Sequence, residues 1–202
     1  MKLAIMTKST FFVEEDKILA SLFDEGLDNL HLFKPNTSPM YSERLLSLLP
    51  EHCHRYITVH DHYYLKQEYE LAAIHIDNPE TPLPEGYKGK YSRTCSDLSL
   101  LKDMKKKSNY VFLKNIFDCI EFHEEKSTFS MSELEQAADK GLIDKKVYAL
   151  GGISMENIQR IKDLGFGGAV ICGDLWNRFD IHNEKDFKEL IAYFAKIRRA
   201  VG

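Results

Sequence analysis

Short apolar runs alternate with amphipathic stretches along nearly the whole chain. Residues 3–6 (LAIM) read as a strand, and residues 14–26 follow with Ile18 and Leu22 at helical spacing and a stop at Gly26. Strands that alternate with helices are typical of parallel strands joined by crossover helices. Further strands are predicted at 28–33, 55–59, 72–76, 89–93, 110–113, 146–150 and 167–172. Further helices are predicted at 42–50, 62–70, 96–107, 132–142, 151–165 and 184–200.

Eight strands and about eight helices in 202 residues predict a (β/α)8 TIM barrel, with an open doubly wound sheet as the alternative. A chain of this length fills one core and is too short for two ordinary domains, so residues 1–202 are expected to form a single domain. Residues 77–89 hold three prolines and two glycines and predict a loop. Residues 114–130 form a second long, polar segment, of the kind that is usually functional or mobile.

The balance of charges excludes some classes of partner. There are 27 Lys and Arg against 31 Asp and Glu, which gives a net charge of −4, whereas sequence-independent binding to nucleic acid needs a basic excess. The chain has no apolar run long enough for a membrane span and no secretory signal at its start. Four widely spaced cysteines without a CxxC motif predict reduced thiols. We therefore expect a cytoplasmic protein with no nucleic-acid or membrane partner.

In a barrel, the residues just past the carboxyl end of each strand form the functional face. Those positions are unusually polar in this chain. They are His31 and Lys34, His60, Asp61 and His62, His75, Asn78 and Glu80, Ser92 to Ser96, Asn115 and Asp118, Gly151 and Gly152, and Gly173 and Asp174.

The segment YALGGISMEN is the strongest local signal. Gly151 and Gly152 stand between a predicted strand and a predicted helix capped by Ser154, where backbone N–H groups and the helix end favour an anion. Gly173, in the loop after the next strand, would complete a phosphate site of the kind that barrels build after strands seven and eight. A tight turn followed by a helix, with no ligand, is the alternative.

Two carboxylates after neighbouring strands form a second signal. Asp61 and Glu80 can share a hard cation such as Mg²⁺, which bridges to the phosphates of a substrate. The alternatives are solvated surface charges, or Asp61 as the cap of the helix that follows.

Three other features predict structure rather than chemistry. The HCH triplet at 52–54 suggests zinc, but adjacent residues in a strand point to opposite sides and no second ligand pair follows. Cys95 has no base beside it in the sequence, so a structural thiol is favoured. The lysines of 102–107 fit compensation of a helix dipole at a solvated C-terminus.

The order of the segments HLFK, VHDHYYL, AIHIDNPE, YVFLKNIF, YALGGISMENI and GFGGAVICGDLW resembles the thiamine phosphate synthase family and its relatives, the thiazole tautomerases. The resemblance covers nearly the whole chain. It implies a (β/α)8 barrel in which hydroxymethylpyrimidine diphosphate loses pyrophosphate to Mg²⁺ and cationic side chains, and the ring nitrogen of a thiazole phosphate captures the pyrimidine.

The resemblance also implies roles for single residues. In VHDH, His60 stands at an Asn of the family motif and Asp61 at a metal-binding Asp. AIHIDNPE matches a segment His-hydrophobic-Gly-Gln-x-Asp, so that His75 is kept, Asn78 replaces the Gln and Glu80 replaces the second metal-binding acid.

The glycines and several basic residues complete the implied site. Gly151 and Gly152 match the phosphate-binding glycines. Relatives have an Arg where this chain has Phe33 and a His near Ser96, and the Thr-x-Thr-Lys loop after strand six is missing. The residues that can replace these lost cations are Lys34, Arg93 and Lys126, the last as a stand-in for the loop lysine.

These departures leave three functions open. The first is a thiamine phosphate synthase with slow turnover, because positive groups that stabilise the leaving pyrophosphate are missing. The second is a thiazole phosphate tautomerase with Asp61, His60 or His75 as the acid–base group. The third is a barrel that binds thiamine phosphate or thiazole phosphate without turnover. In each case the partners are small phosphorylated heterocycles, with Mg²⁺ as cofactor and a homodimer as a further expectation.

Overall fold

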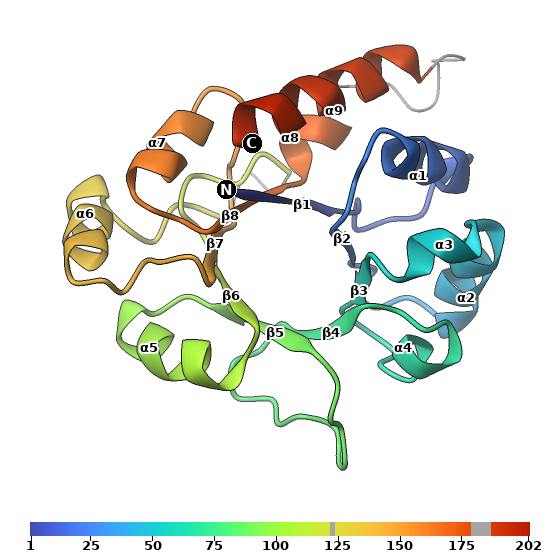
Figure 1. Cartoon of the computed structure of the whole chain (residues 1–202), viewed down its shortest axis with the longest axis horizontal. Helices are drawn as coiled ribbons and strands as arrows, with labels where there is room; N and C mark the ends of the chain where they lie inside the picture. The colour runs from blue at the N-terminus through green and yellow to red at the C-terminus, as the bar shows by residue number, and fades with distance from the viewer. Residues whose placement is uncertain (122–123, 179–186) are drawn as a thin grey trace.

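The strands close into a barrel in chain order, from β1 to β8 and back to β1 (Figure 1). The computed structural model describes residues 1–121, 124–178 and 187–202. Every neighbouring pair of strands is parallel, and β1 pairs with both β2 and β8. The described strands are β1 Lys2–Met6, β2 Leu30–Leu32, β3 Ile57–Val59, β4 Ala73–Ile76, β5 Tyr91–Cys95, β6 Tyr110–Leu113, β7 Val147–Ala149 and β8 Gly168–Ile171. The (β/α)8 barrel is thus confirmed, and the open doubly wound sheet is wrong, because such a sheet leaves two edges unpaired.

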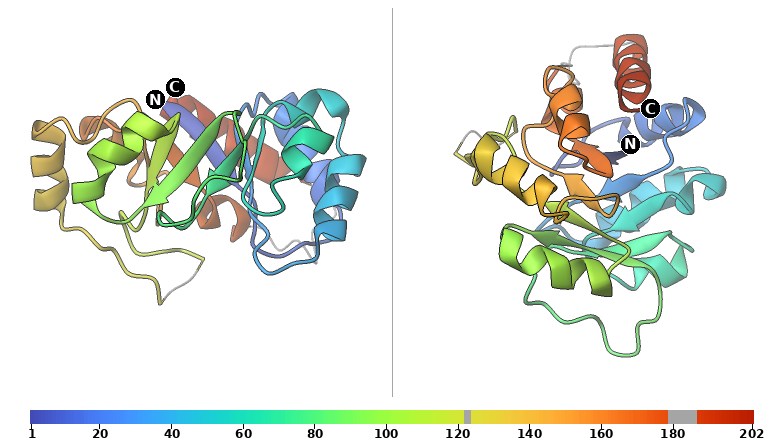
Figure 2. Two further views of the ribbon diagram at one scale, coloured as in Figure 1. Left: turned by 90° about the horizontal axis from the view of Figure 1, so that it is seen from below. Right: turned by 60° about the vertical axis from the view of Figure 1, so that its left-hand side comes forward.

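Helices surround the barrel on the outside, as the side views of Figure 2 also show. They are α1 Glu15–Asp24, α2 Pro39–Leu48, α3 Glu51–His54, α4 Leu65–Glu68, α5 Leu98–Lys107, α6 Met131–Asp139, α7 Ile158–Asp163, α8 Gly173–Trp176 and α9 Lys188–Val201. The start of the last predicted helix, 184–186, lies outside the described residues. The sequence did not predict α3 and α8 as separate helices, because four residues are too few to show a helical period.

The HCH triplet lies in α3 and not in a strand, which corrects the reason given for rejecting a zinc site. His54 is buried and its Nε2 atom bonds the carbonyl of Leu46 at 2.9 Å, whereas His52 is exposed. The two imidazoles therefore have different surroundings, and His54 has a structural partner.

Local sequence signals explain where two helices begin. Asp97 caps α5 by accepting a hydrogen bond from the N–H of Ser99 at 2.8 Å. Ser130 and Glu133 form a reciprocal capping box at the start of α6. These caps satisfy N–H groups that the first turn of a helix leaves without a partner.

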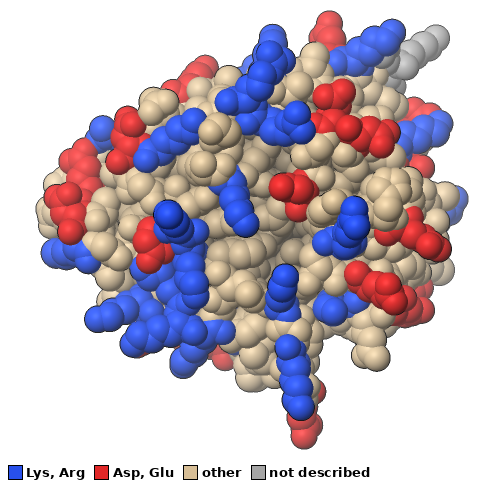
Figure 3. Space-filling view, in the orientation of Figure 1, with Lys and Arg blue, Asp and Glu red and all other residues tan. Residues whose placement is uncertain are grey.

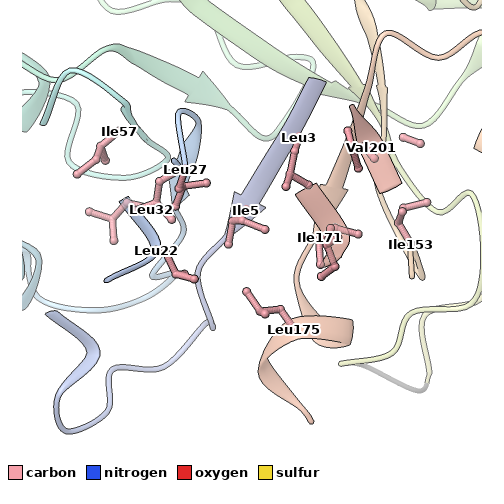
Figure 4. Packing of buried hydrophobic residues seen from close by; sticks show 14 of the residues in the cluster. Leu3, Ile5, Leu22, Leu27, Leu32, Ile57, Ile153, Ile171, Leu175 and Val201 are labelled. Carbon is pink, nitrogen blue, oxygen red and sulfur yellow. The ribbon is translucent and has the colours of Figure 1, made fainter. Parts of the chain in front are cut away.

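Apolar side chains fill the space between the strands and the helices (Figure 4). Leu3 and Ile5 of β1 point outward and pack with residues such as Leu22 of α1 and Ile171 of β8. This layer is the larger hydrophobic cluster of the described chain. Side chains alternate between the two faces of a strand. The residues between these outward-facing ones therefore point into the barrel.

The interior of the barrel is unusually polar. It combines the smaller apolar cluster, which is Ala4, Met6, Phe112, Tyr148 and Val170, with buried polar side chains. The buried polar residues of the inner strands are Thr58, His31, His75, Ser92 and Thr94. Polar groups inside a barrel must find partners in one another, so this interior is a hydrogen-bonded network rather than an apolar plug.

The surface carries both signs of charge (Figure 3). On the face shown there, Lys and Arg side chains gather over α5, whose last turn holds Lys105, Lys106 and Lys107. Lys105 pairs with Asp144 at 2.6 Å and binds the carbonyl of Leu142, so one member of this run has a structural role. No helix among the described residues is long and apolar enough to cross a membrane.

Candidate active site

A pocket of about 380 Å³ lies at the carboxyl ends of the strands. Each strand contributes a residue from its end or from the loop that follows it. These residues are Met6, Phe33, Asp61, Asp77, Thr94, Lys114, Leu150 and Val170. The pocket therefore occupies the face on which barrel enzymes carry their chemistry.

The glycines predicted to bind phosphate line this pocket together. Gly151, Gly152 and Gly173 come from the β7 and β8 loops. Gly151 has φ +101° and Gly152 has φ +63°, both in the left-handed region that favours glycine. Within the described chain, the backbone N–H groups of Gly151 and Gly152 donate no hydrogen bond, so both are available to an anion.

The missing side chains also let the loop after β6 approach closely. A Cβ atom at Gly152 would lie 2.3 Å from the carbonyl oxygen of Asp118, and one at Gly173 would lie 2.9 Å from the Cβ of Ile120. The first part of the 114–130 segment is therefore packed against the glycines and forms a wall of the pocket. The glycines serve this packing as well as any ligand.

Asp61 lies in the pocket and does not cap a helix. The helix that follows, α4, begins at Leu65 with Tyr64 before it and has no side-chain cap. The Oδ2 atom of Asp61 is buried without a hydrogen-bond partner among the described residues. A buried carboxylate oxygen without a partner is unfavourable unless a cation or another donor binds it. This rules out the capping alternative and fits a cation ligand.

The second predicted acid, Glu80, has a different position. Glu80 is exposed in the loop between β4 and β5, and its N–H donates to Oδ1 of Asn78 at 2.9 Å. Neither residue is among those that line the pocket. The local turn that they form with Pro79 between them holds both side chains near the surface.

Asp77, which sequence reasoning missed, is an acid at the end of a strand that lines the same pocket as Asp61. Both oxygens of Asp77 accept hydrogen bonds from Nδ1 of His60, at 2.9 and 3.0 Å. Asp77 directly follows β4, as Asp61 closely follows β3, so the strand-end rule alone would have selected it. The family segment has Gly at the position of Asp77 and an acid at the position of Glu80. The resemblance therefore predicted Glu80 as the metal ligand.

His60 and His75 are buried in the barrel below the pocket. The Nδ1 and Nε2 atoms of His75 bond the hydroxyls of Ser92 and Thr94 at 2.7 and 2.8 Å. Burial, aided by His60, lowers the pKa of His75 and of the neighbouring His31 well below the usual value, so both are neutral at pH 7. Neither predicted catalytic histidine lines the pocket directly, and His60 reaches it through Asp77.

Lys34 is buried and its ammonium group is bound by protein oxygens. Its ammonium group donates to Glu15 at 2.6 Å and to the carbonyls of Lys8 and Thr10, both at 2.9 Å. Lys34 and Glu15 are 1% and 2% exposed. Lys34 therefore ties the loop after β1 to the end of β2, and it is not among the residues that line the pocket.

The other two predicted cations also have protein partners. Arg93 donates to the carbonyls of Pro79 and Thr81, at 3.1 and 2.9 Å, and so holds the loop between β4 and β5. Lys126 is exposed and pairs with Asp118 at 3.1 Å. Neither lines the pocket, so the structure does not bring these cations together at the site.

The pocket contains charged groups that the sequence did not single out. Lys114 is the one Lys or Arg among the described lining residues, and it pairs with Glu125 at 3.1 Å. Glu121 accepts a hydrogen bond from the Cys172 thiol at 2.9 Å. Burial and this carboxylate raise the pKa of Cys172 well above its usual value, so the thiol stays protonated.

Cys53, Cys95, Cys119 and Cys172 form no disulfide bond with one another. Cys95 is fully buried and donates to the carbonyl of Asp97 at 3.0 Å. Burial raises the pKa of Cys95, which fits a structural thiol better than a nucleophile.

Comparison with known proteins places this site in a family. A scan against protein-family models and a search of curated protein sequences find no match. Among solved structures, a thiamine phosphate pyrophosphorylase from Bacteroides thetaiotaomicron is 46% identical, has a TM-score of 0.90, and matches over 99% of this chain and 97% of its own.

More distant structures share the fold. A thiamine phosphate pyrophosphorylase from Pyrococcus furiosus matches with a TM-score of 0.76 at 13% identity, over 99% of this chain and 95% of its own. A 3-hexulose-6-phosphate synthase matches with a TM-score of 0.64 at 13% identity, over the full length of both chains. Identity at this level supports the barrel alone, whereas 46% identity over almost the full length shows kinship. The chain belongs to the thiamine phosphate pyrophosphorylase family.

Proposed function

We propose that this protein is a thiamine phosphate synthase that joins hydroxymethylpyrimidine diphosphate to a thiazole phosphate with release of pyrophosphate. The observation that carries this proposal is one pocket with an anion site and a cation ligand. Gly151 and Gly152, whose N–H groups donate no hydrogen bond in the described chain, line the same cavity as Asp61, whose Oδ2 atom lacks a partner there. Family membership supports the same reaction.

The glycine side of the pocket suits the thiazole phosphate. The N–H groups of Gly151 and Gly152 bind its phosphate oxygens, as backbone donors do at other barrel phosphate sites. Gly173 lines the same pocket, and its missing side chain lets Ile120 and Glu121 pack closely against it. This anchors the nucleophile with its ring nitrogen directed toward the other half of the pocket.

The Asp61 side suits the diphosphate. Mg²⁺, when bound there, neutralises negative charge on the leaving pyrophosphate. Asp61 would hold the cation, since its Oδ2 atom is buried without a hydrogen-bond partner in the described chain. Glu80 would reach this position only after a movement of the exposed loop between β4 and β5.

Part of the remaining wall of the pocket is apolar. Met6, Phe33 and Ile120 cover its interior and exclude water from the reacting carbon. Exclusion of water matters here because a pyrimidine that has lost pyrophosphate would otherwise be captured by water instead of the thiazole nitrogen. The chain thus supplies binding, orientation and protection from hydrolysis.

A barrel that binds the phosphorylated ligand without turnover is the second candidate. It is favoured by the placement of the cations, because Lys34, Arg93 and Lys126 are all engaged outside the pocket. Among the described lining residues, this leaves Lys114 to face the leaving group. We therefore expect synthase turnover to be slow. A thiazole tautomerase is less favoured, since no His follows β5.

Release of pyrophosphate separates the two candidates. We expect the protein to release pyrophosphate and form thiamine phosphate when hydroxymethylpyrimidine diphosphate, thiazole phosphate and Mg²⁺ are all supplied. Omission of the thiazole phosphate should reduce the product to background. Tight binding of thiamine phosphate without any pyrophosphate release would replace the synthase by the binding barrel.

Replacing Gly152 with Val should weaken thiamine phosphate binding tenfold or more, which corresponds to about 1.4 kcal/mol. A Cβ atom there meets the Asp118 carbonyl, and φ +63° strains any branched side chain. Calorimetric titration measures the affinity. Gly141→Val is the matched control, because Gly141 has φ +68° but open space around it. Unchanged affinity in Gly152→Val would contradict the phosphate site.

Replacing Asp61 with Asn should abolish Mg²⁺-dependent binding of pyrophosphate and leave thiazole phosphate binding unchanged. The reason is that the amide removes the negative charge on the oxygen that fits the cation. Calorimetry with each ligand, with and without Mg²⁺, tests this. Equal loss of both affinities would show that Asp61 has a structural role.

A further inference from the structure

A continuous chain of hydrogen bonds runs from the pocket into the barrel interior. Asp77 at the pocket bonds Nδ1 of His60, Nε2 of His60 bonds Nδ1 of His31 at 2.8 Å, and Nε2 of His31 bonds the hydroxyl of Tyr110 at 2.8 Å. These residues follow or belong to four different strands of the barrel, so only the closed fold brings them together.

For neutral imidazole rings, the Asp77 carboxylate assigns a direction to each hydrogen bond of this series. The carboxylate of Asp77 only accepts, so Nδ1 of His60 carries the proton and its Nε2 accepts. Nδ1 of His31 must then donate to His60, and Nε2 of His31 must accept from the Tyr110 hydroxyl. This arrangement of protons satisfies all four groups, and it directs the Nδ1–H group of His60 at Asp77.

The histidines fit this chain better than a metal site. His31, His60 and His75 each offer one nitrogen within 4.8 Å of the others. However, two nitrogens bound to one tetrahedral zinc ion lie about 3.3 Å apart, whereas those of His31 and His60 are 2.8 Å apart and share a proton. The rings of His60 and His75 are stacked at 4.3 Å, so their lone pairs do not converge.

Asp77 bonds His60 and also lines the pocket, where a ligand can reach its carboxylate. Its side chain is 44% exposed and lines the pocket, while both oxygens share the single N–H group of His60. Each oxygen therefore keeps lone pairs for a second donor. The described lining holds four carboxylates, with Lys114 as the balancing cation, so donors with positive character are favoured. The four are Asp61, Asp77, Glu121 and Glu125.

We propose that Asp77 determines specificity by accepting a hydrogen bond from an exocyclic N–H group of an amino-substituted heterocycle, with His60 and His31 as its positioning residues. The inference rests on the proposed function, in which that heterocycle is the aminopyrimidine of the diphosphate substrate. The ring lies against the apolar wall that includes Phe33, and its amino group meets a carboxylate whose orientation the histidine chain has already fixed.

Comparison of two ligands tests the role of Asp77. Calorimetry measures the affinity of hydroxymethylpyrimidine diphosphate and of its analogue with hydrogen in place of the amino group, both with Mg²⁺. The wild type should prefer the amino ligand by about 10-fold to 100-fold, as for a hydrogen bond to a charged group. Asp77→Ala should lose this preference, whereas Glu85→Gln, an exposed acid in the same loop, should keep it.

Variants of His60 test the positioning role. His60→Leu removes the donor below Asp77 and should reduce the preference for the amino ligand, while His60→Gln supplies an amide N–H group and should restore part of it. Thiazole phosphate affinity serves as the readout of an intact fold and should stay constant in both variants. If His60→Leu does not fold, the pair of wild type and Asp77→Ala still decides the proposal.

The outcomes separate this inference from the function on which it rests. Equal preference for the amino ligand in wild type and Asp77→Ala would overturn the inference and leave the synthase intact. Failure of the wild type to bind either pyrimidine ligand would overturn the proposed function and the inference with it. Binding of one zinc ion by the wild type, lost in His31→Asn, would overturn the assignment of the histidines.

Discussion

Replacing Lys34 with Met is expected to lower the free energy of unfolding by about 3–5 kcal/mol, the usual effect of removing one partner from a buried ion pair. The substitution leaves Glu15 2% exposed with no cation beside it, and its Oε2 atom has no hydrogen-bond partner in the described chain even now. The carbonyls of Lys8 and Thr10 lose their donor as well. Urea denaturation followed by circular dichroism measures the change.

The effect should depend on pH in a defined direction. Burial already raises the pKa of Glu15, and the Lys34 ammonium opposes that rise. Without Lys34 the pKa of Glu15 rises further, so the carboxyl can take up a proton at low pH and avoid a buried charge. The destabilisation should therefore be larger at pH 8 than at pH 5.

Two controls show whether Lys34 stabilises the fold or binds a ligand. Lys17→Met removes an exposed ion pair with Glu14 and should leave the stability unchanged. The double variant Lys34→Met with Glu15→Leu removes both buried charges and should recover most of the loss. If Lys34→Met kept the stability of the wild type but bound pyrophosphate more weakly, Lys34 would be a ligand-binding residue and not a structural one.

Mild acid should destabilise the protein through His31 and His75. Both are buried and have pKa values well below 6.5 in the folded state, because burial disfavours the charged imidazolium. The unfolded chain protonates them near the ordinary value, so below about pH 6.5 it binds more protons than the folded chain. Stability then falls as the pH falls, by at most about 1.4 kcal/mol per pH unit for each histidine.

Unfolding by urea between pH 7.5 and 5 measures this slope. His31→Phe removes one of the two groups, and its slope should be shallower by up to about 1.4 kcal/mol per pH unit, whatever its absolute stability. His52→Gln, which changes an exposed imidazole, should have the slope of the wild type. A flat profile between pH 7 and 5 in the wild type would contradict neutral, buried histidines.

The barrel and the glycine side of the pocket could be predicted from the sequence because their signals are local. Apolar runs alternate with helical stretches over short distances, and the topology of parallel strands then places every strand end on one face. Gly151, Gly152 and Gly173 stand at such ends and do line one pocket. Asp61 was found by the same rule.

The residues around these positions could be placed only from the tertiary structure. Lys34 and Glu15 are 19 residues apart, yet they form a buried pair that removes Lys34 from the site. Asp77 lines the same pocket as Asp61 and accepts a hydrogen bond from His60, 17 residues away in the sequence.

The physical reason is that a side chain's partner is set by burial and closure of the barrel. Nothing in the residues beside Lys34 or Arg93 in the sequence shows that protein oxygens will bind the charged groups of both. Sequence alone determined which backbone segments meet at the functional face. The tertiary structure decided which of the charged groups there are free to meet a ligand, since desolvation penalises any charge that lacks a partner.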